Sequence, residues 1–158
     1  MHLKKKSDYI EAVKCLQSKP ATTSFQGVRT RFDDFQALHI NLAEVIHAVG
    51  QFLGWHRQFL FVYEKALREE CGYQGAQSYV SSFPDIAKSP IFDPHTSFGG
   101  NDVDSTHPDM FGTDHSPATN RSSGWGERCV KDGPFASYEV VLGPGKLIND
   151  HSLVRNIN

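Results

Sequence analysis

The chain has 158 residues and a formal net charge of −2, and 39% of its residues are hydrophobic, which is the composition of one globular domain with a core of its own. The small net charge argues against a nucleic-acid-binding surface, and no apolar stretch is long enough to cross a bilayer. The N-terminal sequence MHLKKKSDYI lacks the apolar segment of a secretory signal, so the compartment is unknown, with the cytoplasm as the default.

The first predicted element is a helix over Tyr9–Gln17. Ser7 and Asp8 are suitable caps at its start, and Pro20 ends it. The preceding Lys4–Lys6 run is expected to be a solvated lead-in to this helix. The packing face is expected to carry Tyr9, Val13, Leu16 and Gln17.

A polar stretch over 21–30 leads to the second predicted helix, in which Thr30 precedes the sequence RFDDFQALHINLAEVIHAV. Asp33 and Asp34 fall in its first turn, where carboxylates complement the helix dipole. One face of this helix carries Phe32, Phe35 and His39 at the spacing i, i+3, i+7.

The third predicted helix, over Trp55–Glu70, has the clearest helical pattern in the chain. Gly50 and Gly54 interrupt the pattern before it, and Cys71-Gly72 ends it. Its stripe consists of His56, Phe59, Tyr63, Ala66 and Leu67.

Beyond Gly72 the chain is rich in Gly, Pro, Ser, Asn and Asp, and residues 73–137 are predicted to form a long loop-rich excursion. Alternation over Tyr138–Leu142 predicts a strand that Gly143 closes. We therefore expect a mainly α fold, in which an antiparallel helix core is accompanied by long irregular loops and a short β-strand. All of it is expected to lie in a single domain, 1–158.

The cysteines leave two alternatives open. Cys15, Cys71 and Cys129 are too far apart for a zinc-binding C-x-x-C motif. Three free thiols are the default in the cytosol, whereas an oxidising compartment allows one disulfide and one free thiol. The glycosylation sequon at Asn120 matters only if the chain is secreted.

The candidate site is a group of three histidines in the most aromatic part of the chain. His39, His47 and His56 follow the pattern H-x7-H-x8-H. Antiparallel helices could bring these positions together around one ion, and three imidazoles without a nearby thiolate or carboxylate suit copper or zinc. The alternative is that His39 and His47 are hydrogen-bonded core histidines and His56 only caps its helix.

The run IHAVGQFLGWHRQFLFVYEKALREECGY resembles the first copper-binding signature of tyrosinases and catechol oxidases, the type-3 copper proteins, and is most similar to the short fungal members. RFDDFQALHI, SPIFDPHTSFGGN and CVKDGPFASYEVVLGPGKL carry the same resemblance. It implies that His39, His47 and His56 bind the first copper ion. It also implies copper-dependent oxidation of phenols or o-diphenols to o-quinones with O2, in a family whose members are often secreted.

The resemblance implies a second copper ion as well, held by three more histidines on a downstream helix pair, and we expect this chain to lack it. The remaining histidines do not pair at helical spacing and are expected to be surface or loop residues: His2, His95, His107, His115 and His151. We therefore expect one copper ion in a truncated tyrosinase-like domain, with no catalytic residue assigned.

Three functional hypotheses remain at this point. The first is a tyrosinase-like oxidoreductase that is not active alone and uses a phenolic small molecule and O2 only when completed. The second is a non-catalytic copper-binding or interaction protein, in which a partner chain or another copy covers an exposed apolar face. That face is expected to contain Phe32, Phe35, Leu42, Phe52, Phe59, Leu60 and Tyr63. The third, a decaying paralogue, is favoured by Tyr79–Phe83, where relatives usually carry Tyr-Trp-Asp-Trp.

Overall fold

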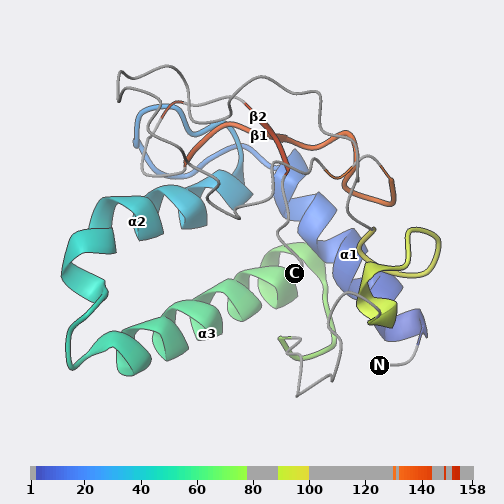
Figure 1. Cartoon of the computed structure of the whole chain (residues 1–158), viewed down its shortest axis with the longest axis horizontal. Coiled ribbons are helices and arrows are strands. Elements are labelled where there is room, and N and C mark those ends of the chain that lie inside the picture. The colour runs from blue at the N-terminus through green and yellow to red at the C-terminus, as the bar shows by residue number, and fades with distance from the viewer. Residues whose placement is uncertain are drawn as a thin grey trace, which may run out of the picture. The chain divides into compact units, whose positions relative to one another are not determined.

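The computed structural model describes residues 3–77, 89–99, 130, 132–143, 148 and 151–153. Its elements in chain order are α1 (Leu3–Ser18), α2 (Arg31–Ile46), α3 (Phe52–Cys71), the 3-10 helix η2 (Pro90–Phe92), β1 (Glu139–Val140) and β2 (His151–Ser152) (Figure 1). The predicted mainly α fold is confirmed. None of these helices is both long and apolar enough to span a membrane.

The contacts divide the chain into two compact units. One unit comprises residues 1–81 together with 141–150, and it contains α1, α2 and α3. The other comprises residues 82–140 together with 151–158, and it contains η2, β1 and β2. All three candidate metal ligands lie in the first unit.

α1 begins at Leu3, six residues before the predicted start, so the predicted caps are wrong. Ser7 lies inside the helix, where its hydroxyl donates to the carboxylate of Glu11 at 3.2 Å. The longer helix places Lys6 in the same row as Tyr9 and Val13, and Lys6 is only 7% exposed. The expectation of a solvated lysine cluster is therefore wrong at Lys6, because a lysine stem can pack along an apolar face.

α2 begins as predicted, with Thr30 as its N-cap. The Thr30 hydroxyl accepts from the N–H of Asp33, and the Asp33 carboxylate accepts from the N–H of Thr30, so the two residues form a capping box. On one side of α2, Ala37 packs in a buried cluster with Val141 and Leu142. Partly buried Phe25, Val28 and Ile40 pack against this cluster.

α3 begins at Phe52, so Gly54 lies within the helix and does not interrupt it, contrary to the prediction. The helix ends as predicted: Gly72 has a left-handed φ of 71°, its N–H donates to the Arg68 carbonyl, and the N–H of Tyr73 donates to the Leu67 carbonyl. Ala66 and Leu67 on the predicted stripe are buried.

Gly54 within α3 and Gly72 at its C-cap should respond to alanine in opposite directions. Neither has a neighbouring atom within 4 Å of an added Cβ. Gly72→Ala should lower the free energy of unfolding by about 1 kcal/mol because alanine resists the left-handed conformation. Gly54→Ala should raise it by about 0.5–1 kcal/mol because alanine favours the helix. Denaturant unfolding of both variants measures this, and two changes of the same sign would contradict it.

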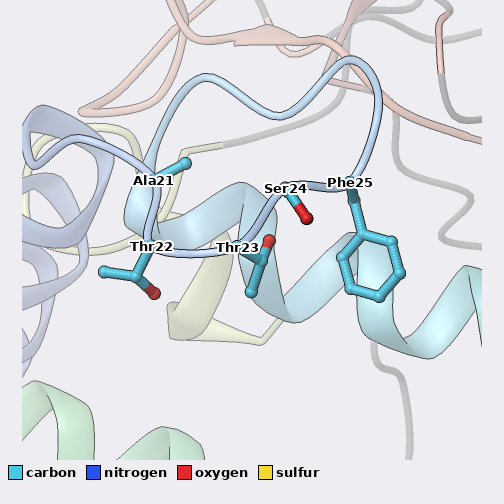
Figure 2. Close-up of a pocket in the computed structure, with 5 residues that line it drawn as sticks. All are labelled: Ala21, Thr22, Thr23, Ser24 and Phe25. Carbon is cyan, nitrogen blue, oxygen red and sulfur yellow. The ribbon is translucent and has the colours of Figure 1, made fainter.

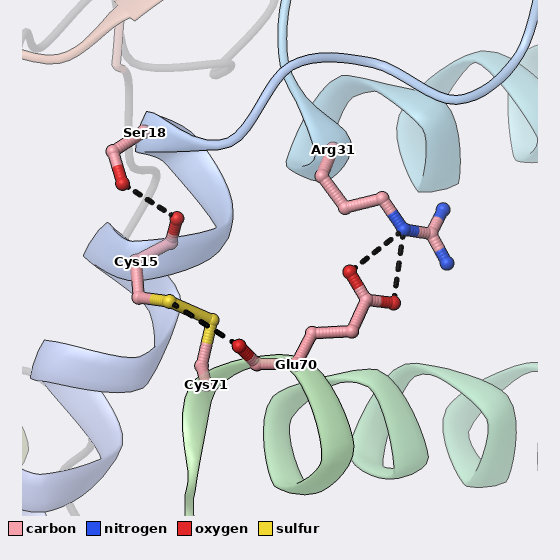
Figure 3. The surroundings of a disulfide bond; sticks show 5 residues. All are labelled: Cys15, Ser18, Arg31, Glu70 and Cys71. Carbon is pink, nitrogen blue, oxygen red and sulfur yellow. Dashed lines mark hydrogen bonds and ion pairs between the residues drawn. A yellow bond between two sulfur atoms is a disulfide. The ribbon is translucent and has the colours of Figure 1, made fainter.

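α1 packs against both α2 and α3, and a disulfide joins Cys15 on α1 to Cys71 at the end of α3 (Figure 3). Of the two cysteine alternatives, the structure therefore has the one with a disulfide. Beside the disulfide, Arg31 Nε donates to both carboxylate oxygens of Glu70, at 3.1 and 3.2 Å. Residues from the ends of all three helices meet at this junction.

The predicted strand is shorter than expected. Only Glu139 and Val140 enter the ladder, where they pair antiparallel with Ser152 and His151 of β2. Val141 and Leu142 leave the ladder because they pack in the cluster with Ala37. β2 was not predicted, since this short polar segment has no apolar alternation. Several predicted features lie outside the described residues: His2, Tyr79–Phe83, His107, His115, the sequon at Asn120 and Cys129.

Candidate metal centre

The three predicted histidines lie together at the connected ends of α2 and α3. His39 is in the second half of α2, His47 is its C-cap, and His56 is in the first half of α3. These antiparallel helices are joined by a short turn (Figure 1). One ring nitrogen from each histidine lies within 4.8 Å of the other two. All three side chains are partly buried. Because their nitrogens lie so close together, they form one group with the dimensions of a metal site.

Main-chain carbonyls orient two of the imidazoles. His47 Nδ1 lies 2.7 Å from the carbonyl oxygen of Ala43, and His56 Nδ1 lies 2.7 Å from that of Phe52. A carbonyl oxygen only accepts hydrogen bonds, so in each ring Nδ1 carries a hydrogen, and the neutral form of that ring has its lone pair on Nε2. No carbonyl partner of His39 is found within the described part of the chain.

The surroundings of His39 favour its neutral imidazole. Burial lowers the pKa of His39, and the neighbouring rings of His47 and His56 lower it further. His39 Nε2 is 3.3 Å from His56 Nε2. Two lone pairs at that separation repel each other unless a proton or a cation lies between them. The donor set therefore fits a cation bound by neutral imidazoles.

Aromatic rings contact the histidines. The Trp55 and Phe59 rings are stacked with centroids 5.1 Å apart, and Phe59 lies 5.9 Å from the ring of His39. Phe52 lies 4.2 Å from the ring of His56. The contact of Phe52 was not predicted, because the sequence pattern places Phe52 in a break before the helix.

The turn between the helices contains a residue in an unusual conformation. Ala48, directly after His47, has a φ of 56°, in the left-handed region that non-glycine residues rarely adopt. The turn closes with the N–H of Phe52 donating to the carbonyl of Val49 at 3.1 Å. Nothing in the sequence at Ala48 signals this conformation, since alanine has no preference for it.

The model of the common central domain of tyrosinase matches residues 29–157. The chain belongs to the tyrosinase family. The family resemblance seen in the sequence is thereby confirmed, and family membership implies copper as the metal, with His39, His47 and His56 as a group that could hold it. The refinement from "copper or zinc" to copper comes from the family and not from the geometry, because three imidazoles suit either metal.

Individual members of the tyrosinase family are similar over most of this chain. The tyrosinase-like protein orsC of Emericella nidulans is 43% identical over 155 residues, covering 87% of this chain and 41% of the relative. N-acetyl-6-hydroxytryptophan oxidase ivoB of the same organism is 42% identical over 146 residues, covering 86% and 40%. The chain thus spans about two-fifths of the length of these relatives.

A solved structure of this family has the same fold. The polyphenol oxidase from Thermothelomyces thermophila matches with a TM-score of 0.81 and 37% sequence identity. The match covers 99% of this chain and 46% of that chain. The helical arrangement that carries the three histidines is therefore an arrangement of this family.

Of the other histidines, the described part of this tyrosinase-family chain includes His95 and His151, and both belong to the second of the two units. His95 is exposed, in a turn where the Asp93 carboxylate accepts from the N–H groups of His95 and Thr96. Hydrogen bonds from Thr96 hold the pKa of Asp93 below its ordinary value. His151 lies in β2. Among the described residues, no second group of three potential ligands occurs.

The predicted exposed apolar face is partly wrong. Phe35 is only 7% exposed because it packs between α2 and α3 against Phe59 and Tyr63. Phe52 and Leu60 are exposed as predicted. The most exposed large apolar side chains of the two helices are Leu53, at 77%, Phe61, at 60%, and Val45, at 59%, none of which was predicted.

A cavity of about 510 Å³ lies beside the loop before α2, and none of the three histidines is among its lining residues. It is lined by Ala21, Thr22, Thr23, Ser24 and Phe25 (Figure 2). The hydroxyls of Thr22 and Thr23 donate to the Asp34 carboxylate at 2.8 and 2.6 Å, so they are engaged in holding the loop. The cavity is therefore not a candidate for the chemistry of this family.

Proposed function

We propose that this chain forms the first copper site of a tyrosinase-like oxidoreductase, with His39, His47 and His56 as the ligands. The observation that supports this most directly is the placement of three ring nitrogens within 4.8 Å of one another. When bound, copper supplies the electron-transfer chemistry by which phenols or o-diphenols are oxidised to o-quinones with O2. The proposed substrates are therefore phenolic small molecules, and one relative is named for its action on N-acetyl-6-hydroxytryptophan.

The residues of the chain have distinct roles in this proposal. The three imidazoles hold the cation through nitrogen, and the carbonyls of Ala43 and Phe52 keep two of the rings in the tautomer that presents Nε2. Because burial and neighbouring rings lower the pKa of His39, this ligand remains neutral at neutral pH. The Trp55, Phe59 and Phe52 rings lie against the imidazoles and cover part of their surface.

We further propose that the chain binds one copper ion and does not oxidise phenols alone. Outside the proposed ligands, no two histidines of the sequence stand three or four residues apart, and the described residues contain no second ligand group. The family reaction requires a second copper, so its ligands would have to come from another polypeptide segment. In this proposal 1–158 acts as a single copper-binding domain, with 73–137 as a loop-rich excursion within it.

A second candidate is a non-catalytic copper-binding or interaction protein. Leu53, Phe61 and Val45 are more than half exposed on the two helices that carry the histidines, and such patches mark interaction surfaces. A partner chain or a second copy would cover them. A monomer by analytical ultracentrifugation, with little binding of a hydrophobic dye, would argue against this candidate.

Copper stoichiometry on the purified chain tests the proposal. We expect about one copper per chain in the wild type and less than about 0.1 in His56→Ala, because losing a ligand should weaken binding by more than the 10–100-fold caused by losing an outer hydrogen bond. The matched control is His95→Ala, which removes an exposed histidine outside the group and should keep the copper.

A catechol oxidation assay on the same loaded samples separates the parts of the proposal. One copper without turnover supports an incomplete site. Two coppers with turnover would overturn the claim of a single site, and equal copper in His56→Ala and wild type would overturn the ligand assignment.

A further inference from the structure

The far ends of the two metal-binding helices are tied together by a junction of covalent and ionic contacts. The Cys15–Cys71 disulfide joins α1 to the end of α3, and the N–H of Arg31 donates to the Lys19 carbonyl beyond α1 at 2.9 Å. The Arg31 side chain then bridges to α3 through both carboxylate oxygens of Glu70 (Figure 3). Glu70 directly precedes Cys71, so the ion pair and the disulfide hold the same turn of α3.

A continuous series of side-chain contacts leads from this junction to the histidines. The Arg31 guanidinium lies 4.6 Å above the ring of Phe35. Phe35 makes an edge contact with Phe59, at a centroid distance of 6.1 Å, and Phe59 lies 5.9 Å from His39. Phe35 also contacts Tyr63 at 5.2 Å. These rings fill the space between α2 and α3, so they set how far apart the two helices stand.

The spacing of the helices matters for metal binding because the ligands come from both of them. His39 is on α2 and His56 is on α3, about 21 Å along α3 from Glu70 at 1.5 Å per residue. Close-packed interiors transmit displacements because they have few voids to absorb them. Loosening α3 at the junction would therefore change the packing of Phe35 and Phe59 and the separation of the imidazoles.

We propose that Arg31 and Phe35 are positioning residues for the metal centre, and that through them the Cys15–Cys71 disulfide and metal occupancy of the histidines stabilise each other. This inference rests on the proposed function only in that the three histidines must bind a metal. Binding free energies are reciprocal: if the intact disulfide strengthens metal binding by some factor, the bound metal disfavours reduction of the disulfide by the same factor.

The redox step involved is ordinary thiol–disulfide exchange. Two molecules of glutathione give up two electrons and become glutathione disulfide, while the Cys15–Cys71 bond breaks and each sulfur becomes a thiol. The metal gains and loses no electrons in this exchange. Zn²⁺ is therefore the probe of choice, because it binds imidazole and has no redox chemistry of its own.

The test is an equilibrium titration of the disulfide in glutathione buffers, with and without saturating Zn²⁺, at fixed pH. A Cys129→Ser background removes the third thiol. We expect Zn²⁺ to make reduction about fivefold to tenfold less favourable, at the lower end of typical coupling between sites. In the reverse direction, Zn²⁺ affinity should fall by the same factor when the disulfide is reduced.

Matched variants test the positioning residues. Phe35→Leu keeps an apolar side chain but loses the ring contacts, and its control is Phe61→Leu, at an exposed phenylalanine of α3. Glu70→Gln weakens the ion pair with Arg31 without removing the side chain. Its control is Glu69→Gln, which weakens an exposed ion pair with Lys65. The compared quantity is the ratio of the disulfide's reduction constants without and with Zn²⁺. Phe35→Leu and Glu70→Gln should move this ratio towards one, whereas the two control variants should leave it at the wild-type value. A merely destabilising substitution does not move this ratio.

His56→Ala distinguishes the failure of this inference from the failure of the proposed function. If Zn²⁺ acted through the free thiols, it would favour reduction, and the effect would persist in this variant. Wild-type protein that binds Zn²⁺ through the histidines but has an unchanged reduction constant would overturn the coupling alone. Wild type and His56→Ala that bind Zn²⁺ equally would overturn both proposals.

Discussion

Replacing Cys15 and Cys71 together by serine is expected to lower the free energy of unfolding by about 4 kcal/mol. The disulfide spans a sequence separation of 56 residues, and closing a loop of that length in the unfolded chain removes about this much conformational entropy. The bond also joins α1 to the end of α3, so its loss removes the only covalent tie within the described residues between two helices distant in sequence. Removing a native disulfide from a small domain usually lowers the free energy of unfolding by about 2–5 kcal/mol.

Urea unfolding of the oxidised protein and of the double variant gives this difference directly. Cys129→Ser is the control for the loss of a thiol and is expected to change the stability little. A difference below about 1 kcal/mol would mean that Arg31 and Glu70, with the packing around them, hold the helices without the disulfide.

Asp34→Ala is expected to destabilise the fold by about 3–5 kcal/mol, as breaking a buried charged network generally does. The Asp34 residue is 2% exposed, and its carboxylate accepts from the N–H and the hydroxyl of both Thr22 and Thr23, at 2.6–3.1 Å. It also pairs with Arg31 at 3.2 Å. Alanine would leave these donors without an acceptor, and the loop over 21–25 would lose its attachment to α2. Glu44→Ala, at an exposed position of the same helix, should change stability by less than about 0.5 kcal/mol.

The same carboxylate makes stability depend on acid pH. Burial raises the pKa of Asp34, but the hydrogen bonds from Thr23 and Thr22 outweigh it, so the pKa lies below its ordinary value of 3.8. A group with a lowered pKa in the folded state stabilises the protein above its unfolded pKa, and this stability is lost as pH falls through the folded value. Wild type should therefore lose stability from Asp34 below about pH 3.8, and Asp34→Ala should lack this part of the pH dependence in unfolding curves from pH 5 to 2.5. An identical pH dependence in both proteins would contradict the assignment.

The histidine group was predictable because its geometry is almost local. His39 lies on the face of α2 that also carries Phe35, His47 ends that helix, and His56 follows after a turn too short to carry it away from them. Once the two helices are antiparallel, these positions must approach each other. The family resemblance of the Trp55-His56 segment added the identity of the metal, which spacing alone leaves between copper and zinc.

Other features depend on packing that no local pattern encodes. The burial of Lys6 follows from the early start of α1, and the role of Asp34 follows from the path of the loop before α2 rather than from the helix dipole. The end of the predicted strand was wrong because Val141 and Leu142 find apolar partners beside Ala37. A residue such as Ala48 takes its left-handed conformation from the closure of the turn around it.

The sequence by itself determined the three helices, the Thr30 and Gly72 caps and the three histidines, because helical periodicity and capping act over a few neighbouring residues. Only the tertiary structure decided that Cys15 pairs with Cys71, and that Arg31 and Phe35 connect this disulfide to His39. These contacts join α1, α2 and α3 across tens of residues. Their existence depends on how the helices pack, which a one-dimensional pattern of residues does not specify.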